Sequence, residues 1–290
     1  MPFPKELLIG IETSDDAAVY QINESQAIVA TTDFFMPIVD DPFDFGKIAA
    51  TNAISDIYAM GGIPKFITVA MSATGDEKLE WMLDIARGIA EEAHKVGAQV
   101  IGGDLSGSEE ITISITVFGE CQEPFLRSGA QVGDQIYISD LTGWSAAGLK
   151  ALQAGQKDSN FEAAINRHQV PKFDGKATEI FSIGANSLCD ISDSLLIQGE
   201  QMAEASGVCF EIDGRLFEGH PDFAKLSHLA NQLGLNVFDL ILSGGEDHVF
   251  LATYSGSKPA NALRIGQVLS GSGIKLLHVD TPQPGWRHFQ

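Results

Sequence analysis

The stretch DFGKIAATNAISDIYAMGGIPKFITVAMS, residues 44–72, decides how the first part of this chain folds. Apolar residues recur at a spacing of about 3.6 between Phe45 and Met60, which predicts an amphipathic helix over 44–60. Gly61-Gly62-Ile63-Pro64 ends that helix, because glycine and proline interrupt the helical pattern. Residues 66–72 are apolar and partly β-branched, which favours a strand. The stretch therefore predicts a helix that leads directly into a strand.

The same alternation of short strands and helices continues on both sides of this stretch. The expected strands are 17–20, 27–30, 111–118, 135–139, 208–212, 240–242 and 249–254. The expected helices are 76–96, 145–154, 175–183 and one that ends near residue 205. A chain of 290 residues is too long for one small core, and a second unit begins near residues 121–133. We therefore predict an α+β protein of two domains, residues 1–122 and 123–290.

The composition is that of a globular protein with an excess of acidic residues. Asp and Glu number 39 against 18 Lys and Arg, which gives a formal net charge of −21. This charge argues against a nucleic-acid partner or an anionic membrane partner, because both are themselves negatively charged. Two interpretations of the acidic residues remain open: sites for divalent cations, or a solvated acidic surface.

Cysteine usage and hydropathy indicate the compartment. Cys121, Cys189 and Cys209 are odd in number and show no CxxC spacing, so we expect neither a disulfide framework nor a zinc knuckle. No apolar run approaches 18 residues, and no signal-peptide pattern opens the sequence. We therefore expect a cytoplasmic protein without a membrane span.

Aspartates recur where the pattern above predicts turns after strands or helix starts. The motifs are Asp15-Asp16, Thr31-Thr32-Asp33, Asn52-x-x-Ser55-Asp56, Gly103-Asp104, Asp190-x-Ser192-Asp193 and Glu246-Asp247. Mg²⁺ takes carboxylate and hydroxyl oxygens, and substrate phosphates usually complete its coordination. Each motif by itself is also typical of a helix N-cap or an Asx-turn. Only their number indicates a site for metal and phosphate.

The familiar phosphate-binding and catalytic motifs are missing. The sequence contains no GxxxxGK[ST], no H-R-D, no HExxH and no GxSxG. Gly102-Gly103-Asp104 and Gly244-Gly245-Glu246-Asp247 could bring backbone N–H groups to phosphate oxygens, or could form ordinary turns. Arg127 could bind a phosphate through two hydrogen bonds, or form a surface salt bridge. The residues alone leave these alternatives open.

A set of motifs in a fixed order resembles a known family. From about residue 65 to the end, the chain resembles thiamine-monophosphate kinase, in the superfamily that includes aminoimidazole-ribonucleotide synthetase and selenophosphate synthetase. The matching motifs are Val100-Ile101-Gly102-Gly103-Asp104, Leu126-Arg127-Ser128-Gly129-Ala130, Gly143-Trp144-Ser145-Ala146-Ala147-Gly148-Leu149, Cys189-Asp190-Ile191-Ser192-Asp193, Leu242-Ser243-Gly244-Gly245-Glu246-Asp247 and Gly285-Trp286-Arg287-His288-Phe289. Residues 10–64 are instead similar to selenophosphate synthetase. A divergent natural member of the superfamily and a chimera would both show this division.

The resemblance implies a fold and a set of sites. The fold would have two domains, each a mixed sheet with helices on one face, and would form a homodimer through the N-terminal sheets. The N-terminal domain would bind ATP and metal, and the C-terminal domain would complete the active-site cleft. Mg²⁺ would be held by Asp16, Thr31, Thr32, Asp33, Asp56, Asp104, Asp190 and Asp193. ATP would contact Gly103, Asp104, Arg127 and Ser192, thiamine phosphate would contact Glu246 and Trp286, and the catalytic residues would be Asp104, Arg127 and Asp193.

The sequence departs from the kinase pattern at two places. The kinases have a substrate-contacting histidine shortly after the Thr-Asp motif, and residues 34–41 contain none. The Asp-x-Ser-Asp motif normally continues with glycine, and this chain has Ser194. Both departures concern binding of the phosphoryl acceptor more than binding of ATP.

The resemblance implies transfer of the γ-phosphoryl group of ATP to thiamine monophosphate, with several Mg²⁺ ions. The acceptor phosphate is already anionic at neutral pH, so this transfer needs no general base. Two other interpretations remain. One is a selenophosphate synthetase or another phosphotransferase of the superfamily, although no cysteine precedes Cys121. The other is a protein that binds nucleotide without turnover.

Overall fold

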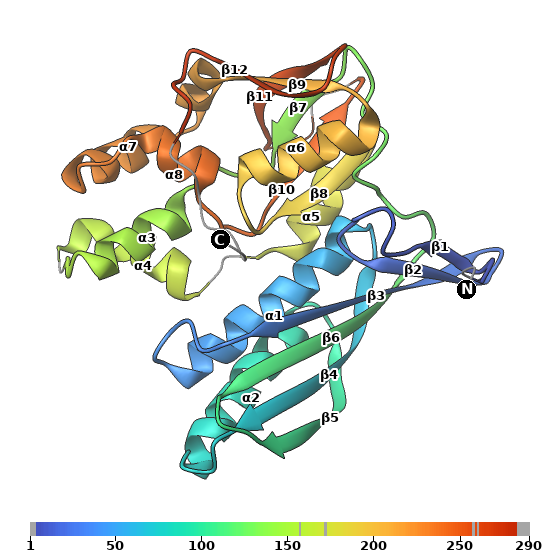
Figure 1. The fold of residues 1–290 in the computed structure, drawn as a ribbon, viewed down its shortest axis with the longest axis vertical. Helices are drawn as coiled ribbons and strands as arrows, with labels where there is room; N and C mark the ends of the chain where they lie inside the picture. The colour runs from blue at the N-terminus through green and yellow to red at the C-terminus, as the bar shows by residue number, and fades with distance from the viewer. Residues whose placement is uncertain (1–3, 157, 171–172, 257–258, 260, 283–290) are drawn as a thin grey trace. The chain divides into compact units, whose positions relative to one another are not determined.

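The computed structural model describes residues 4–156, 158–170, 173–256, 259 and 261–282. The chain forms two compact units, Met1–Pro124 and Phe125–Gln290. Each unit contains one six-stranded sheet and its own helices (Figure 1). Within the described residues, no helix combines the length and the apolar character that crossing a bilayer requires.

The sheet of the first unit has the strand order β1-β2-β3-β6-β4-β5. Its strands are β1 Leu7–Ile9, β2 Ala18–Asn23, β3 Gln26–Phe35, β4 Ile63–Ala73, β5 Gln99–Gly107 and β6 Thr112–Cys121. β4 and β5 run parallel, and every other neighbouring pair runs antiparallel. The sheet is therefore mixed, with β5 as an edge strand.

Two helices cover one face of this sheet. α1 (Pro42–Ala59) packs against β3, β4 and β6, and α2 (Leu79–Lys95) packs against α1. The side chain of Asp41 accepts hydrogen bonds from the first turn of α1 and so caps it. A Cβ on Gly46 of α1 would overlap the backbone of α2, and one on Gly88 of α2 would overlap that of α1. Glycine at both positions lets the helices cross closely.

The strands of the first unit alternate between a helix-covered face and an open face. On β6, Ile113, Ile115 and Val117 are fully buried toward the helices, and Ser114 and Thr116 between them point the other way. Residues that pair across neighbouring strands share a face, so the pairing register assigns every position of the sheet to one of the two faces.

The sheet of the second unit has the order β12-β9-β11-β7-β10-β8. Its strands are β7 Gln135–Ile138, β8 Ser187–Ile191, β9 Cys209–Asp213, β10 Val249–Tyr254, β11 Leu263–Leu269 and β12 Gly273–Leu277. Only β12 and β9 are parallel among the described pairs. This sheet is therefore also mixed.

The second unit has six helices among its described residues. They are α3 Trp144–Gln153, α4 Glu162–Gln169, α5 Gly175–Ser182, α6 Leu195–Ser206, α7 Phe223–Gln232 and α8 Val237–Ser243, with 3₁₀ turns at Ser159–Phe161 and Gly214–Gly219. All of these helices except α5 build one continuous apolar core with the sheet. α6 packs on the sheet, and α3 packs against α4, α7 and α8. Phe250 and Tyr254 alternate with the core residues Val249 and Leu251, and Tyr254 donates a hydrogen bond to the carbonyl oxygen of Phe181 in α5. α5 thus adds a contact on the opposite face.

The predicted fold class is confirmed: the protein is α+β, and each unit is a mixed sheet with helices. One predicted strand is wrong, because residues 240–242 lie in α8. The side chain of Asn236 caps this helix by accepting from the N–H of Phe238 at 2.9 Å. Several acidic motifs also lie elsewhere than in turns or at helix starts: residues 31–33 lie inside β3, 52–56 inside α1, 102–104 inside β5, and Asp190 inside β8. The sequence pattern did not predict α4, α7, β1, β11 or β12.

Candidate active site

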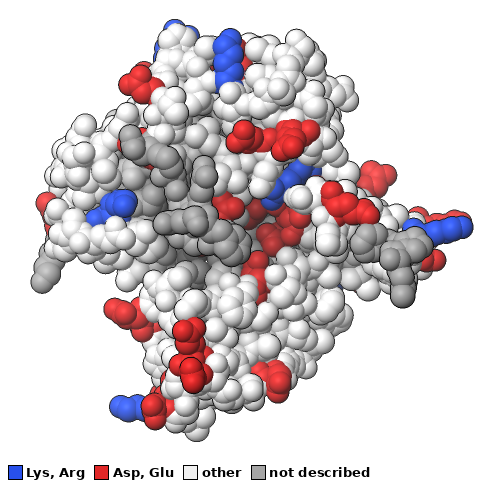
Figure 2. Space-filling model, viewed as in Figure 1, with Lys and Arg blue, Asp and Glu red and all other residues white. Residues whose placement is uncertain are grey.

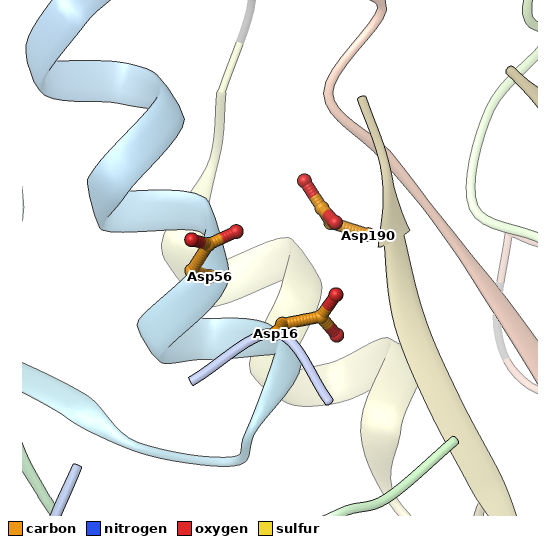
Figure 3. Close-up of side chains that lie close together, drawn as sticks. All are labelled: Asp16, Asp56 and Asp190. Carbon is orange, nitrogen blue, oxygen red and sulfur yellow. The ribbon is translucent and has the colours of Figure 1, made fainter. Parts of the chain in front are cut away.

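Asp16 and Asp56 form the acidic centre of the first unit. Asp56 lies on α1, Asp16 lies in the chain just before β2, and their carboxylate oxygens come within 4.8 Å of one another (Figure 3). Thr31 of β3 donates a hydrogen bond from Oγ1 to Oδ2 of Asp56 at 2.8 Å, and the same oxygen lies 3.4 Å from the backbone carbonyl of Asp16. Three sequence-predicted ligands, far apart in the chain, are thus brought together.

Two neighbouring polar residues of α1 have local structural roles. Asn52 donates from Nδ2 to the carbonyl of Ile48 at 3.1 Å, and Ser55 donates from Oγ to the carbonyl of Asn52 at 2.8 Å. Both side chains are buried away from water, so these bonds to carbonyl groups of their own helix give their polar atoms hydrogen-bond partners. Within the motif 52–56, Asp56 is therefore the residue that presents a carboxylate to the site.

The pairing register divides the remaining predicted ligands between the two faces of the sheet. Thr31 pairs with Val117 and Asp33 with Ile115, so both lie on the helix-covered face with Asp56. Thr32 pairs with Thr116 on the open face, where the two hydroxyl oxygens lie 2.9 Å apart. The motif Thr31-Thr32-Asp33 therefore serves both faces of β3.

Asp104 lies on the open face, away from the other ligands of its unit. It pairs with Ala70 of β4, Ala70 pairs with Ser114 of β6, and Ser114 pairs with Phe34 of β3. Three strand spacings of about 4.8 Å separate β5 from β3, or about 14 Å in all. The first unit of one chain therefore does not bring Asp104 to Asp16, Asp33 or Asp56.

The two glycines before Asp104 differ in what surrounds them. A Cβ on Gly103 would overlap the carbonyl oxygen of Val69 in β4, whereas a Cβ on Gly102 would meet nothing within 4 Å. Gly103 is thus required for close pairing of β4 and β5, and Gly102 leaves the strand surface accessible.

This difference predicts unequal effects on folding. Gly103→Ala is expected to lower the free energy of unfolding by about 1–3 kcal/mol, because β4 and β5 must separate to admit the methyl group. Gly102→Ala is the matched control and should change that free energy by no more than about 0.5 kcal/mol. Urea unfolding of both variants measures the difference. Equal stabilities would show that β5 does not pair in this register.

In the second unit, Asp190 ends up on β8 (Figure 3), and Ser192 and Asp193 follow in the turn that leads into α6. Ser194 is the N-cap of α6, where its Oγ accepts from the N–H of Ile197 at 3.2 Å. Its φ of −176° is extended backbone that any residue adopts. The serine that replaces the expected glycine is therefore compatible with this turn.

The segment 244–247 lies directly on that turn. The N–H of Glu246 donates to the carbonyl oxygen of Ser192 at 2.7 Å. A Cβ on Gly245 would overlap the carbonyl oxygens of both Ser192 and Asp193. The structure therefore brings the predicted acceptor residue Glu246 beside the predicted nucleotide residue Ser192.

The sequence marks Asp247 only as part of an acidic motif. The structure shows which groups its carboxylate contacts. Its carboxylate is buried at the start of α3, where it accepts from the N–H of Ser145 at 2.9 Å and from that of Gly143 at 2.5 Å. Burial raises the pKa of Asp247 to about 6, against the lowering effect of those two N–H groups.

Sequence reasoning missed a histidine close to this segment. His168 of α4 lies with Nδ1 3.1 Å from Oγ of Ser145. Burial lowers the pKa of His168, and the negative charge of Glu246 opposes that shift. No local motif marks His168, because its partners come from α3 and from the segment after α8.

Arg127 is buried rather than exposed, with 8% of its surface accessible. Its Nη1 donates a hydrogen bond to Oε1 of Gln201 on α6. Ser206 at the end of the same helix donates from Oγ to the carbonyl of Arg127 at 3.3 Å. The arginine is therefore held against α6. The predicted acceptor contact Trp286 lies outside the described residues.

Acidic side chains are spread over both units on the face drawn in Figure 2. Together with the net charge of −21, they make the surface repulsive to a polyanion such as a nucleotide triphosphate. A ligand of that kind would bind here only with compensating cations.

Comparisons with known proteins identify the relatives of this chain. Residues 14–121 match the family model "AIR synthase related protein, N-terminal domain". A thiamine-monophosphate kinase of Mycobacterium tuberculosis is 31% identical over 296 residues, which cover 99% of this chain and 87% of that protein. A solved structure of AaThiL complexed with AMPPCP and TMP has a TM-score of 0.87 at 28% identity, over 95% of this chain and 91% of that one.

A selenide, water dikinase of Dechloromonas aromatica is 46% identical over 168 residues, which cover 56% of this chain and 47% of that protein. Both predicted resemblances are therefore confirmed. The kinase match runs through nearly the whole chain and so extends into residues 10–64 as well. The chain belongs to the thiamine-monophosphate kinase family of enzymes, in the AIR synthase-related superfamily.

Proposed function

We propose that this protein transfers the γ-phosphoryl group of ATP to the phosphate of thiamine monophosphate, giving thiamine diphosphate and ADP. Its family membership supports this function, as does its similarity to a structure that holds both an ATP analogue and TMP. The observation that carries the proposal is the pair of carboxylates at Asp16 and Asp56, with the hydroxyl of Thr31 beside them.

This donor set fits Mg²⁺. Two carboxylates within 4.8 Å repel each other unless a cation lies between them, and their oxygens and the threonine hydroxyl are hard ligands. When bound, Mg²⁺ neutralises the charge that develops on the transferred phosphoryl group. Asp33 lies on the same face of β3 as Thr31 and can share this role.

The second unit supplies residues for both substrates in this proposal. We assign cation binding to Asp190 and Asp193, and ATP contacts to Ser192 and to Arg127, whose guanidinium suits phosphate. Glu246 and Trp286 would contact thiamine phosphate, Trp286 by stacking on a ring. No side chain needs to remove a proton, because the attacking phosphate oxygen is already anionic.

We also propose that the protein acts as a homodimer in which Asp104 serves the partner's site. The open face of the first sheet exposes large apolar side chains, including Phe34 at 66% and Phe66 at 48%. Asp104 and Gly103 lie on that sheet but about 14 Å from β3. A second copy packed on the open face would cover the apolar side chains and bring its β5 toward Thr32 of the first copy, whose neighbours Thr31 and Asp33 face Asp56 on the other side of β3.

Product analysis tests the function directly. We expect the protein with ATP, Mg²⁺ and thiamine monophosphate to form ADP and thiamine diphosphate in equal amounts. The similarity to a selenide, water dikinase makes selenide the second acceptor to compare. Chromatography of the nucleotides decides between them, because AMP formed only with selenide would replace the kinase proposal with a selenophosphate synthetase.

Cys121 and Cys189 are buried, which disfavours a reactive thiol at either position.

Nucleotide binding is expected to require a divalent cation. By calorimetry without acceptor, ATP should bind at least about tenfold more weakly in EDTA than in Mg²⁺, because the acidic site repels the triphosphate. Sodium chloride at matched ionic strength controls for general screening. Equal affinities in EDTA and in Mg²⁺ would mean that Asp16 and Asp56 do not hold a nucleotide-bound cation.

A further inference from the structure

The N-terminus of α3 is occupied by the carboxylate of Asp247, which comes from far along the chain. One carboxylate oxygen accepts from the N–H of Ser145 and the other from that of Gly143, and the side chain is 4% exposed. Both oxygens are thus fixed by backbone donors, and the helix N-terminus favours their negative charge. Asp247 joins α3 rigidly to the segment that follows α8.

The backbone on either side of Asp247 is held in an unfavourable conformation. Glu246 has a φ of 62° and His248 a φ of 51°, the left-handed region that residues with a side chain rarely adopt. Such a conformation persists only where surrounding contacts enforce it. These contacts include the two bonds of Asp247, the bond from the N–H of Glu246 to Ser192, the close packing of Gly245, and the approach of Nε2 of His248 to Oε2 of Glu246 at 3.6 Å.

We propose that Asp247 is a positioning residue that holds Glu246 in its left-handed conformation and thereby directs the Glu246 side chain toward the phosphoryl acceptor. The inference rests on the proposed function, in which Glu246 contacts thiamine phosphate. We assign Asp247 no direct substrate contact, because the residue is 4% exposed and both of its oxygens face backbone N–H groups at the start of α3.

Asparagine at 247 tests the arrangement with little change in volume. Its amide oxygen can accept from one of the two N–H groups, but its NH₂ group would then face the other, donor against donor. The segment is expected to relax and Glu246 to lose its fixed direction. We expect the KM for thiamine monophosphate to rise about 5- to 20-fold while that for ATP stays within about twofold, the signature of weakened binding of one substrate. Asp247→Ser, whose hydroxyl oxygen can accept from one N–H group while its O–H rotates away from the other, serves if Asp247→Asn does not fold.

A double-mutant cycle with Glu246→Gln separates positioning from general destabilisation. If Asp247 acts through Glu246, adding Asp247→Asn to Glu246→Gln should lower kcat/KM for the acceptor by less than about twofold further. If the two residues acted independently, the double variant would instead lose the product of the two single effects. Thr142→Val is the matched control. It removes the buried bond from Oγ1 of Thr142 to the carbonyl of Ile241 at the same helix end, so it should lower the melting temperature without changing either KM.

Three results would overturn the proposal. Multiplicative effects in the cycle would show that Asp247 and Glu246 act independently. Equal rises in the KM values for thiamine monophosphate and for ATP in Asp247→Asn, with the same rises in Thr142→Val, would show that the bond from Asp247 to α3 is only structural. An unchanged acceptor KM in Asp247→Asn would remove its role while leaving the proposed function intact. Failure of the proposed function is distinguishable, because the unmodified protein would then form no thiamine diphosphate.

Discussion

Replacing Asp56 by asparagine is expected to lower kcat for ADP formation about 100- to 1,000-fold with thiamine monophosphate as acceptor. The variant keeps the shape of the side chain but removes one of the two charges that would hold the cation. Charge stabilisation by a bound metal is worth several kcal/mol in a transition state, and about 1.4 kcal/mol corresponds to a tenfold change in rate. Initial rates at saturating ATP and Mg²⁺ measure the effect.

The same substitution should not destabilise the fold. Without a cation, the carboxylates of Asp16 and Asp56 repel each other across at most 4.8 Å, and asparagine removes that repulsion. Thr31 can still donate its hydrogen bond to the amide oxygen at position 56. We therefore expect the melting temperature in EDTA to be equal to or above that of the unmodified protein. Lost activity without lost stability would mark Asp56 as a functional residue.

Asp44→Asn is the matched control, because it makes the same chemical change on the same helix. Asp44 lies in the first turn of α1, and the structure does not place it with Asp16 or Thr31. Burial and the negative charge of Asp41 raise the pKa of Asp44, so removing its charge should not destabilise the fold at neutral pH and should leave kcat unchanged. An Asp56→Asn enzyme with kcat within threefold of normal and an unchanged Mg²⁺ requirement would refute the proposed cation site.

Much of this fold and part of the site followed from local sequence. The periodic apolar pattern predicted α1 and α2, although α2 buries one face and α1 is buried nearly all round. Leu240, Ile241 and Leu242 were misassigned since three apolar residues are too few to separate a strand from a buried helix, and the cap at Asn236 decided the outcome. Thr31-Thr32-Asp33 was polar enough to suggest a turn, yet it lies within β3. Thr31 and Asp33 lie on the helix-covered face of that strand, and Thr32 lies on the open face.

The distances between motifs could not be predicted in the same way. Asp247 and Ser145 are joined by a bond between segments far apart in sequence, and no local pattern encodes such a contact. Asp104 shares a motif with Gly103, but only the register of β5, β4, β6 and β3 shows that two strands, β4 and β6, lie between it and Thr32. Motif order suggested that all the aspartates belong to one site, and the sheet shows that one copy of the first unit cannot assemble them.

This separation leads to the last expected result, which concerns mixed dimers. If Asp104 serves the partner's site, each site combines Asp56 from one copy with Asp104 from the other. Asp56→Asn and Asp104→Asn homodimers should then both be nearly inactive. A dimer of one Asp56→Asn copy and one Asp104→Asn copy, however, should contain one site with both aspartates intact and one with neither.

Mixing the two inactive variants in equal amounts, with unfolding and refolding to exchange subunits, should therefore restore activity. Half of the dimers would be mixed and half of the sites in them intact, so about one quarter of the normal activity is expected for a two-fold symmetric dimer. Each variant refolded alone is the control, and light scattering confirms the dimer. If Asp104 instead acted within its own copy, no mixed dimer would contain an intact site and the mixture would stay inactive. Recovery to about one quarter would thus show both that the protein dimerises and that the open face of its first sheet brings Asp104 to a neighbouring copy.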